Sequence, residues 1–154
     1  MTKFQVVVVD DEPLAREVAV SILRRDPEVA AVVECGDGVQ ARHMIEDSRP
    51  DIVFLGVEMP GLDGMQLAEH CQSAGPVVVF ITAFSRYAVD AFDLAATDYV
   101  LKPYSDERFI EALGRAKRRV RERRLGELAY QMAGVAAELQ RAAVVNAGRR
   151  VGQI

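Results

Sequence analysis

Short apolar runs alternate along the chain with segments in which apolar residues recur at helical spacing. Residues 4–9 are apolar at every position except Gln5 and are followed by two aspartates, which is typical of a strand buried on both faces. Pro13 suits the first turn of a helix, and apolar residues then recur every three or four positions until Asp26-Pro27. The same alternation predicts strands near 29–35, 52–55, 77–81 and 99–101, and helices near 39–47, 65–72, within 87–95 and from about 106 onward.

Five strands alternating with helices predict an α/β fold in which a parallel sheet is covered by helices on both faces. Right-handed crossovers and short turns favour the flavodoxin-like (βα)5 three-layer sandwich with strand order 2-1-3-4-5. In that order the switch point lies between the first and third strands. We therefore expect Asp10, Asp11 and Gly56, which follow those strands, to share one crevice at the carboxyl edge of the sheet.

The segment beyond Arg124 is rich in alanine and valine. Its apolar residues recur at alternating steps of three and four, as in the a and d positions of a heptad repeat: Leu125, Leu128, Met132, Val135, Leu139 and Ala142. The pattern spans under three heptads and contains Gly126 and Gly134, so a helix docked on the domain surface is the alternative to a coiled coil. We predict a domain over residues 1–124 and a C-terminal helical extension over 125–154, acting as a linker or a dimer segment.

Composition narrows the class of protein. The chain has 154 residues, half of them apolar, which suits one compact domain with a tail. No apolar run approaches the roughly 18 residues needed to cross a bilayer, and the first residues lack the layout of a signal peptide. Cys35 and Cys71 lie far apart without a CxxC pair, so neither a zinc site nor a disulfide framework is expected. A cytoplasmic location is the expectation.

Charge is distributed unevenly along the chain. Residues 1–114 carry 9 lysines and arginines against 20 acidic residues, and residues 115–154 carry 10 against 3, which gives net charges of −11 and +7. Most of the positive charge lies in one run, 115–124, of a kind that can face nucleic acid or a membrane surface. No aromatic residue interleaves with this run to stack on bases, so we favour a solvated helical face.

Asp10, Asp11 and Glu12 bring three carboxylates together at the end of the first predicted strand. Such a cluster is electrostatically unfavourable unless a cation compensates it, and carboxylate oxygens suit Mg²⁺. Acidic residues that only favour the N-terminus of the next helix are the alternative. Thr82 and Lys102 follow the fourth and fifth predicted strands, so the sheet brings a hydroxyl and an ammonium group to the same edge. Together these side chains predict a pocket for an anion and a cation.

Four motifs together resemble the receiver domain of two-component response regulators, the family typified by the chemotaxis response regulator. The resemblance covers about residues 3–122, and its motifs are Val9-Asp10-Asp11-Glu12, Met59-Pro60-Gly61-Leu62-Asp63-Gly64, Thr82-Ala83 and Tyr99-Val100-Leu101-Lys102-Pro103. The segments 11–16, 82–92 and 98–103 are similar, more narrowly, to regulators with a LytTR-type DNA-binding output domain.

The resemblance implies that a histidine kinase passes a phosphoryl group to an aspartate at the end of the third strand. Mg²⁺ would be held by the acidic pair Asp10 and Asp11 and by the backbone carbonyl of Glu58. The phosphoryl-binding and switch positions would be Thr82 and Lys102, each contacting a phosphoryl oxygen, with Ala83 beside Thr82, and Tyr99 as an aromatic switch that turns inward. The resemblance also implies a cis peptide bond at Lys102-Pro103. Phosphoryl transfer depends mainly on positioning and charge neutralisation, which such a site supplies.

One position departs from the family pattern. The family has an aspartate two residues before Glu58, where this chain has Gly56. Glycine has no side-chain atom that can accept a phosphoryl group or bind a metal, so the phosphoacceptor position is non-functional. We expect the affinity for Mg²⁺ to be weakened by the lost carboxylate, and Lys102 to turn towards Asp10 or Asp11.

Two hypotheses follow from Gly56. In the first, the domain is held in an inactive-like conformation and acts by constitutive packing, and an inward-turned Tyr99 would contradict it. In the second, Asp51, Asp63 or Asp11 serves as the acceptor instead, although none should lie where the phosphoryl-binding side chains converge.

The sequence is therefore interpreted as the receiver domain of a LytTR-type transcriptional regulator that cannot be phosphorylated at the usual site. The alternative is a phosphorylation-independent module for protein–protein interaction or dimerisation. Its contact surface would be the face of the fourth helix, fifth strand and fifth helix, within 87–119, or the C-terminal helix. The expected partners are a histidine kinase and a second copy of the chain, with DNA bound only through an output domain outside this chain. An enzyme is not expected, because a haloacid-dehalogenase-like phosphatase would need an Asp-x-Asp pair after the first strand.

Overall fold

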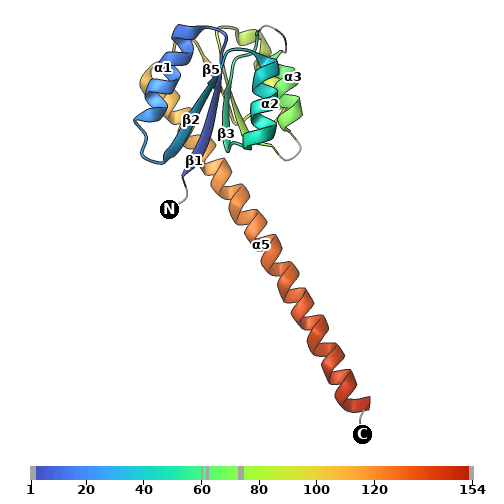
Figure 1. Cartoon of the computed structure of the whole chain (residues 1–154). Coiled ribbons are helices and arrows are strands. Elements are labelled where there is room, and N and C mark those ends of the chain that lie inside the picture. The colour runs from blue at the N-terminus through green and yellow to red at the C-terminus, as the bar shows by residue number, and fades with distance from the viewer. Residues whose placement is uncertain (1–2, 60, 62, 73–74, 153–154) are drawn as a thin grey trace. The chain divides into compact units, whose positions relative to one another are not determined.

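A computed structural model describes residues 3–59, 61, 63–72 and 75–152 (Figure 1). Its elements in chain order are β1 (Phe4–Val9), α1 (Pro13–Arg24), β2 (Val29–Cys35), α2 (Gly38–Ser48), β3 (Ile52–Leu55), α3 (Gly64–Cys71), β4 (Val77–Thr82), the 3₁₀ turn η1 (Ser85–Tyr87), α4 (Ala88–Asp93), β5 (Asp98–Leu101) and α5 (Asp106–Gly152). The strands form one sheet in the order β2-β1-β3-β4-β5, and every neighbouring pair is parallel. The predicted flavodoxin-like fold is therefore confirmed.

Each face of the sheet carries its own apolar core. Val6 and Val8 of β1 belong to a cluster formed with α1 and the first part of α5, whereas Val7 and Val9 belong to a cluster formed with α2, α3 and α4. Figure 1 shows α1 on one side of the sheet and α2 and α3 on the other. A strand whose alternate side chains point into two cores needs apolar residues on both faces, which explains its continuous apolar run.

Local signals explain where the helices begin. Pro13 occupies the first turn of α1, where its missing N–H removes no helical hydrogen bond. The Asp37 carboxylate accepts a hydrogen bond from the Gln40 N–H, 2.8 Å away, at the start of α2. Asp63 caps α3 in a reciprocal capping box with Gln66. These caps place each loop after a strand in a defined position, and the predicted site lies in those loops.

The chain divides into two units, residues 1–120 and 121–154. The predicted boundary at residue 124 lies four residues later, because Val120 is the last buried residue of the core along the chain. Among residues 121–148 the side chains are exposed, apart from the half-buried Arg124 and Ala137. Within the described part of the chain, no helix combines the length and the apolar character that are needed to span a membrane.

Candidate functional site at the carboxyl edge of the sheet

Four strands deliver the predicted site residues to one edge. Asp10 follows β1 and Gly56 follows β3, and the Gly56 N–H donates to the carbonyl oxygen of Val9 over 2.9 Å. Thr82 ends β4 and Lys102 follows β5, and the Lys102 N–H donates to the carbonyl oxygen of Thr82 over 2.8 Å. The ends of parallel strands therefore meet here, as the topological switch point predicted.

Lys102 forms ion pairs with two of the acidic side chains at this edge. Its Nζ lies 2.8 Å from Oδ2 of Asp10 and 3.1 Å from Oε1 of Glu12. The side chains of Lys102 and Asp10 are only 16% and 8% exposed, so this pair is largely removed from water. Burial by itself would lower the pKa of Lys102, but the hydrogen bonds and charges of Asp10 and Glu12 outweigh it and raise the pKa. The expected turn of Lys102 towards Asp10 is confirmed, and its contact with Glu12 is an addition.

The three carboxylates remain close together. Asp10, Asp11 and Glu12 each offer an oxygen, and these oxygens lie within 4.8 Å of one another. However, Asp10 already uses Oδ1 to accept the Glu12 N–H at 3.0 Å and Oδ2 to bind Lys102 at 2.8 Å. A metal ion would have to compete with an internal ammonium group for Asp10. Asp10, Asp11 and Glu12 could hold a divalent cation through their carboxylate oxygens, but the ion would have to share Asp10 with Lys102.

Gly56 is buried, yet its backbone does not need a glycine. Its φ angle lies outside the left-handed region, and an added Cβ would lie 3.5 Å from the Val9 carbonyl oxygen and 3.7 Å from Cγ of Met59, which are ordinary contacts. Gly64 behaves in the opposite way, since a Cβ there would lie 1.9 Å from the carbonyl oxygen of Gly56. Thus a close backbone approach requires glycine at position 64, whereas the surroundings of Gly56 would accept a Cβ atom.

The loop after β4 is tied to the sheet. The hydroxyl oxygen of buried Thr82 accepts the Phe84 N–H over 3.2 Å, while Ala83 between them is exposed. Tyr99 of β5 is half-buried, its ring centroid lies 6.1 Å from that of Phe80, and its hydroxyl donates to the carbonyl oxygen of Phe84. Burial raises the pKa of Tyr99. This inward contact argues against the expectation that the domain is held in an inactive-like conformation with Tyr99 turned outward.

A second tie joins the loops after β3 and β4. Oε1 of Glu58 accepts hydrogen bonds from Nη2 of Arg86, at 2.5 Å, and from the hydroxyl of Tyr87, at 2.6 Å. The Arg86 guanidinium also lies 4.7 Å from the ring centroid of Phe84 and 4.8 Å from that of Tyr87. Sequence reasoning gave Glu58 a role only through its backbone and missed this cluster, because its members lie 28 and 29 residues apart.

Asp98 fixes the start of β5 against α5. It pairs with Arg108 at 2.8 Å and with Arg115 at 2.9 Å. Burial alone would raise the pKa of Asp98, but the hydrogen bonds from Arg108, the Tyr99 N–H and Arg115 lower it to about 2. The carboxylate therefore stays ionised over the whole neutral and mildly acidic range, and it holds the strand that carries Tyr99.

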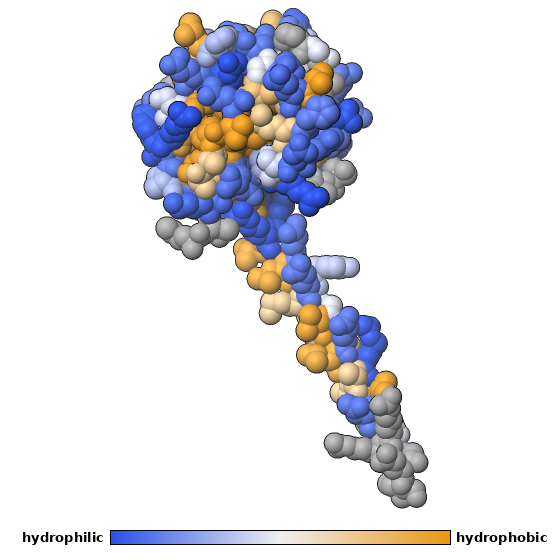
Figure 2. Space-filling view, in the orientation of Figure 1, coloured by the Kyte–Doolittle hydropathy of each residue, from blue (hydrophilic) through white to orange (hydrophobic). Residues whose placement is uncertain are grey.

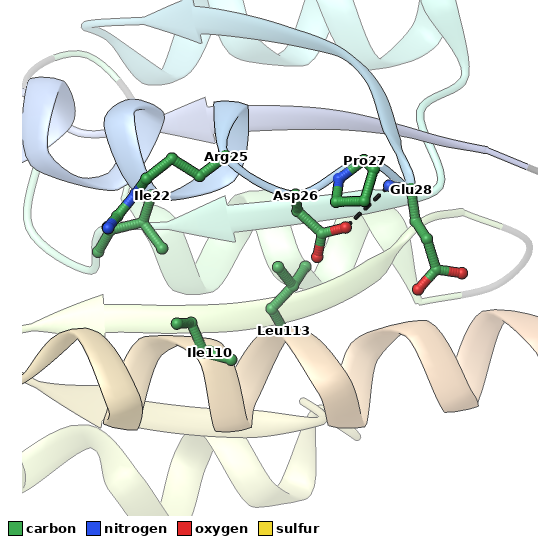
Figure 3. A pocket seen from close by; sticks show the side chains of 7 residues that line it. All are labelled: Ile22, Arg25, Asp26, Pro27, Glu28, Ile110 and Leu113. Atoms are coloured by element: carbon green, nitrogen blue, oxygen red, sulfur yellow. Dashed lines mark hydrogen bonds between the residues drawn. The ribbon is translucent and has the colours of Figure 1, made fainter.

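A surface pocket of about 350 Å³ lies elsewhere, between the end of α1, the turn into β2 and α5 (Figure 3). It is lined by Ile22, Arg25, Asp26, Pro27, Glu28, Ile110 and Leu113. The Asp26 carboxylate in its wall accepts the Glu28 N–H over 2.8 Å, and both acids bind Lys117. Because its lining includes none of the residues at the carboxyl edge, the pocket is separate from the candidate site.

Comparison with known proteins decides the family. Residues 6–114 match the family model described as response regulator receiver domain. The chain belongs to this family. The receiver is 32% identical over 120 residues to the sensory transduction protein LytT of Oceanobacillus iheyensis, which covers 75% of this chain and 49% of that protein. It is 37% identical over 118 residues to the transcriptional regulatory protein BtsR of Escherichia coli K12, with 73% and 48% covered. The chain thus spans about half the length of these curated relatives.

Solved structures agree with this family. The response regulatory domain of protein mrkE from Klebsiella pneumoniae has a TM-score of 0.72 and 32% identity, and the match covers 77% of this chain and 98% of that one. The chemotaxis response regulator CheY4 of Vibrio cholerae has a TM-score of 0.67 at 21% identity, a likeness in fold alone.

The receiver brings most of its predicted site residues to one edge. Asp10, Thr82 and Lys102 meet there around Gly56. The Lys102-Pro103 peptide bond is cis. Of the acids considered as substitute acceptors, Asp51 accepts the Gln5 N–H over 2.8 Å at the opposite end of the strands, and Asp63 caps α3. Both side chains therefore already serve structural roles away from Lys102.

Proposed function

We propose that this receiver transmits its signal without being phosphorylated at position 56. The observation that supports this proposal is Gly56 itself, which has no carboxylate although its backbone could carry a Cβ atom at ordinary distances from its neighbours. In a phosphorylated receiver the acceptor oxygen makes the new bond to phosphorus, and glycine has no atom for that bond. Asp10, Thr82 and Lys102 are all present at the same edge. In the proposal, glycine at position 56 therefore removes phosphoryl transfer but leaves the surrounding site in place.

The neighbouring groups support this proposal. Lys102, which would otherwise neutralise a phosphoryl oxygen, is bound to Asp10 and Glu12. The Tyr99 hydroxyl is bound to the carbonyl oxygen of Phe84, so the switch tyrosine has an internal partner. In the proposal, the surface around α4 and β5 keeps one conformation whether or not a phosphodonor is present.

Weak binding of Mg²⁺ is part of the same proposal. Asp11 is exposed and could bind the ion, but Asp10 is engaged by Lys102, and position 56 contributes no oxygen. Fewer direct carboxylate ligands mean a lower affinity for a hard cation. Magnesium is therefore expected to change the stability of this receiver less than that of the Gly56→Asp variant.

The proposed partners follow from the family. A histidine kinase would approach the carboxyl edge, where α1 begins directly after the acidic cluster and exposes Leu14 and Val18. The names of LytT and BtsR point to signal transduction and transcription. We propose that DNA binding, where it occurs, belongs to an output domain of the LytTR type and not to residues 1–124.

A second candidate function is a binding module. On α4, Val89 and Phe92 are 73% and 80% exposed, and Leu101 of the neighbouring β5 is also exposed. Large apolar side chains grouped on adjacent elements favour a protein partner. The face of α4, β5 and α5 would then bind a second receiver or another protein without any phosphorylation cycle.

Intact mass spectrometry tests the proposal. The chain, Gly56→Asp and Gly56→Asn are each incubated with Mg²⁺ and acetyl phosphate. We expect the mass of one phosphoryl group on Gly56→Asp only, since asparagine matches aspartate in size but is not a phosphoacceptor. A phosphoryl group on the parent chain would overturn the proposal, and peptide mapping would then identify the acceptor among Asp11, Asp51 and Asp63.

A further inference from the structure

The second unit carries an unpartnered apolar stripe. Its large members are Leu125, Leu128, Met132, Val135 and Leu139, which are between 51% and 66% exposed. Figure 2 shows apolar side chains recurring along this helix. Exposed apolar residues scattered singly are ordinary, but five at heptad spacing on one helix are not.

The heptad frame accounts for more than these five residues. With Leu125 at position a, the small residues Ala129, Ala136 and Ala143 all occupy position e, beside the seam. The glycines occupy only positions b and c: Gly126, Gly134 and Gly148. Glycine on the outer face weakens the helix without leaving a gap in the seam. The frame thus keeps glycine out of the seam and places the large apolar residues from 125 to 139 in it, while Tyr130 and Val144 are exposed at position f on the outer face.

This helix needs a partner. Isolated helices are marginal in water even when alanine-rich, and each glycine lowers helix stability further. Each of the five large seam side chains has on the order of 100 Å² of apolar surface to bury. Two copies together offer on the order of 1,000 Å², close to the ~1,000–1,200 Å² at which specific protein interfaces begin. The second unit of another chain supplies a surface of matching length and spacing.

We propose that residues 125–146 pair with the same segment of a second copy as a parallel, in-register, two-stranded coiled coil. Asn146 occupies position a in this frame, and a single asparagine at position a favours a defined register by pairing with its equivalent. An antiparallel pairing that superposes the stripe on itself would place Asn146 opposite Arg121 instead. In the parallel arrangement, position e of one helix lies beside position g of the other. Because alanine occupies position e, no two like charges meet there.

Light scattering across a concentration series is the first test. The parent chain, of 16.9 kDa, is expected to show the mass of two chains. Leu128→Glu with Leu139→Glu should lower it to one chain, while Ala133→Glu with Tyr130→Glu, on the outer face, should leave it at two. A parent chain that stays single up to roughly 100 μM would overturn the proposal. A double seam variant that remains dimeric would overturn it equally, since the contact would then lie on the receiver.

Disulfide crosslinking tests the orientation. Leu128→Cys should crosslink to itself under mild oxidation only if the helices are parallel and in register, and Tyr130→Cys on the outer face is the matched control. The native Cys35 and Cys71 are buried, so the parent chain should not crosslink. Crosslinking between Leu128→Cys and Leu139→Cys chains, without self-crosslinking of either, would show an antiparallel pair and overturn the parallel arrangement. Retained near-ultraviolet circular dichroism confirms that each variant keeps its receiver folded.

Discussion

Two glycines separated by eight positions have opposite roles at the candidate site. Gly64 approaches the carbonyl of Gly56 so closely that a methyl group would overlap it, whereas a methyl group at Gly56 would make only ordinary van der Waals contacts. The first is a packing requirement of the loop that covers β3. The second is a residue without a carboxylate, and the proposed function rests on it.

These roles predict different effects of alanine. Gly56→Ala should leave the free energy of unfolding within about 1 kcal/mol of the parent, because the backbone angle is accessible to alanine and the neighbours are at ordinary distances. Gly64→Ala should lower it by about 3 kcal/mol, because backbone atoms must move. Urea unfolding of both variants measures the difference. Equal stabilities would show that the loop over β3 relaxes freely.

Asp98 predicts an acid-dependent contribution to stability. Its pKa of about 2 in the folded chain lies below its ordinary value of 3.8, so the contribution is complete above about pH 4 and is lost as the pH falls through 2. The shift corresponds to about 2 kcal/mol. Asp98→Asn should therefore be less stable than the parent at pH 6, and the gap should narrow between pH 4 and pH 2.5. The other carboxylates titrate in both proteins and do not change this difference. A difference in the free energy of unfolding that stays constant over this range would contradict the lowered pKa of Asp98.

At the scale of elements, the loops after β3 and β4 are linked to β5 by side chains. Glu58 binds Arg86 and Tyr87, and Tyr99 binds the carbonyl of Phe84. Each bond crosses from one element to another, so the conformation of these loops depends on strands that are not adjacent in sequence. Such ties explain how the switch region has a defined structure although position 56 has no side chain.

Removing the hydrogen bond between Tyr99 and the carbonyl of Phe84 should make the loop after β4 more dynamic. Tyr99→Phe keeps the ring packing but loses the hydrogen bond to Phe84, so we expect faster amide hydrogen exchange over residues 83–88 and a loss of global stability of about 1 kcal/mol. Exchange in β1 should be unchanged apart from the global shift. Tyr130→Phe, at an exposed tyrosine in the second unit, is the matched control. Unchanged exchange in residues 83–88 would show that packing against Phe80 alone holds the loop.

At the scale of the whole molecule, the chain consists of two units that differ in how their apolar residues are buried. The first unit has two apolar cores and ends its core at Val120. The second unit has an apolar stripe and no core of its own among its described residues. The two units also differ in net charge: residues 1–120 carry 13 lysines and arginines against 20 acidic residues, a net charge of −7, and residues 121–154 carry 6 against 3, a net charge of +3.

A chain shortened to residues 1–124 should therefore keep the receiver intact. We expect its thermal midpoint to stay within about 4 °C of the parent at low protein concentration, because no residue of either core is removed. Differential scanning calorimetry measures this shift. A much lower midpoint would mean that the second unit stabilises the receiver directly. Light scattering on the same samples should show a single chain, in line with the inferred coiled coil.

Local patterns in the sequence were sufficient to predict the parallel sheet, its strand order and the residues at its carboxyl edge. Strands read as apolar runs because both of their faces are buried, and parallel strands bring their ends together at one edge. The glycine at position 56 was equally visible, because the identity of one residue needs no tertiary structure. The heptad spacing beyond Arg124 could also be recognised from the sequence, because it depends only on residues close to one another along the chain.

Tertiary structure alone decided which partners the charged and polar side chains take. Lys102 binds Glu12 from 90 residues away as well as Asp10, Arg86 reaches Glu58 across 28 residues, and Tyr99 selects the carbonyl of Phe84. A long side chain reaches several candidates at the same strand edge, and the choice depends on distances of a few ångströms. Those distances are set by how the loops pack on the sheet, which no periodicity along the chain records.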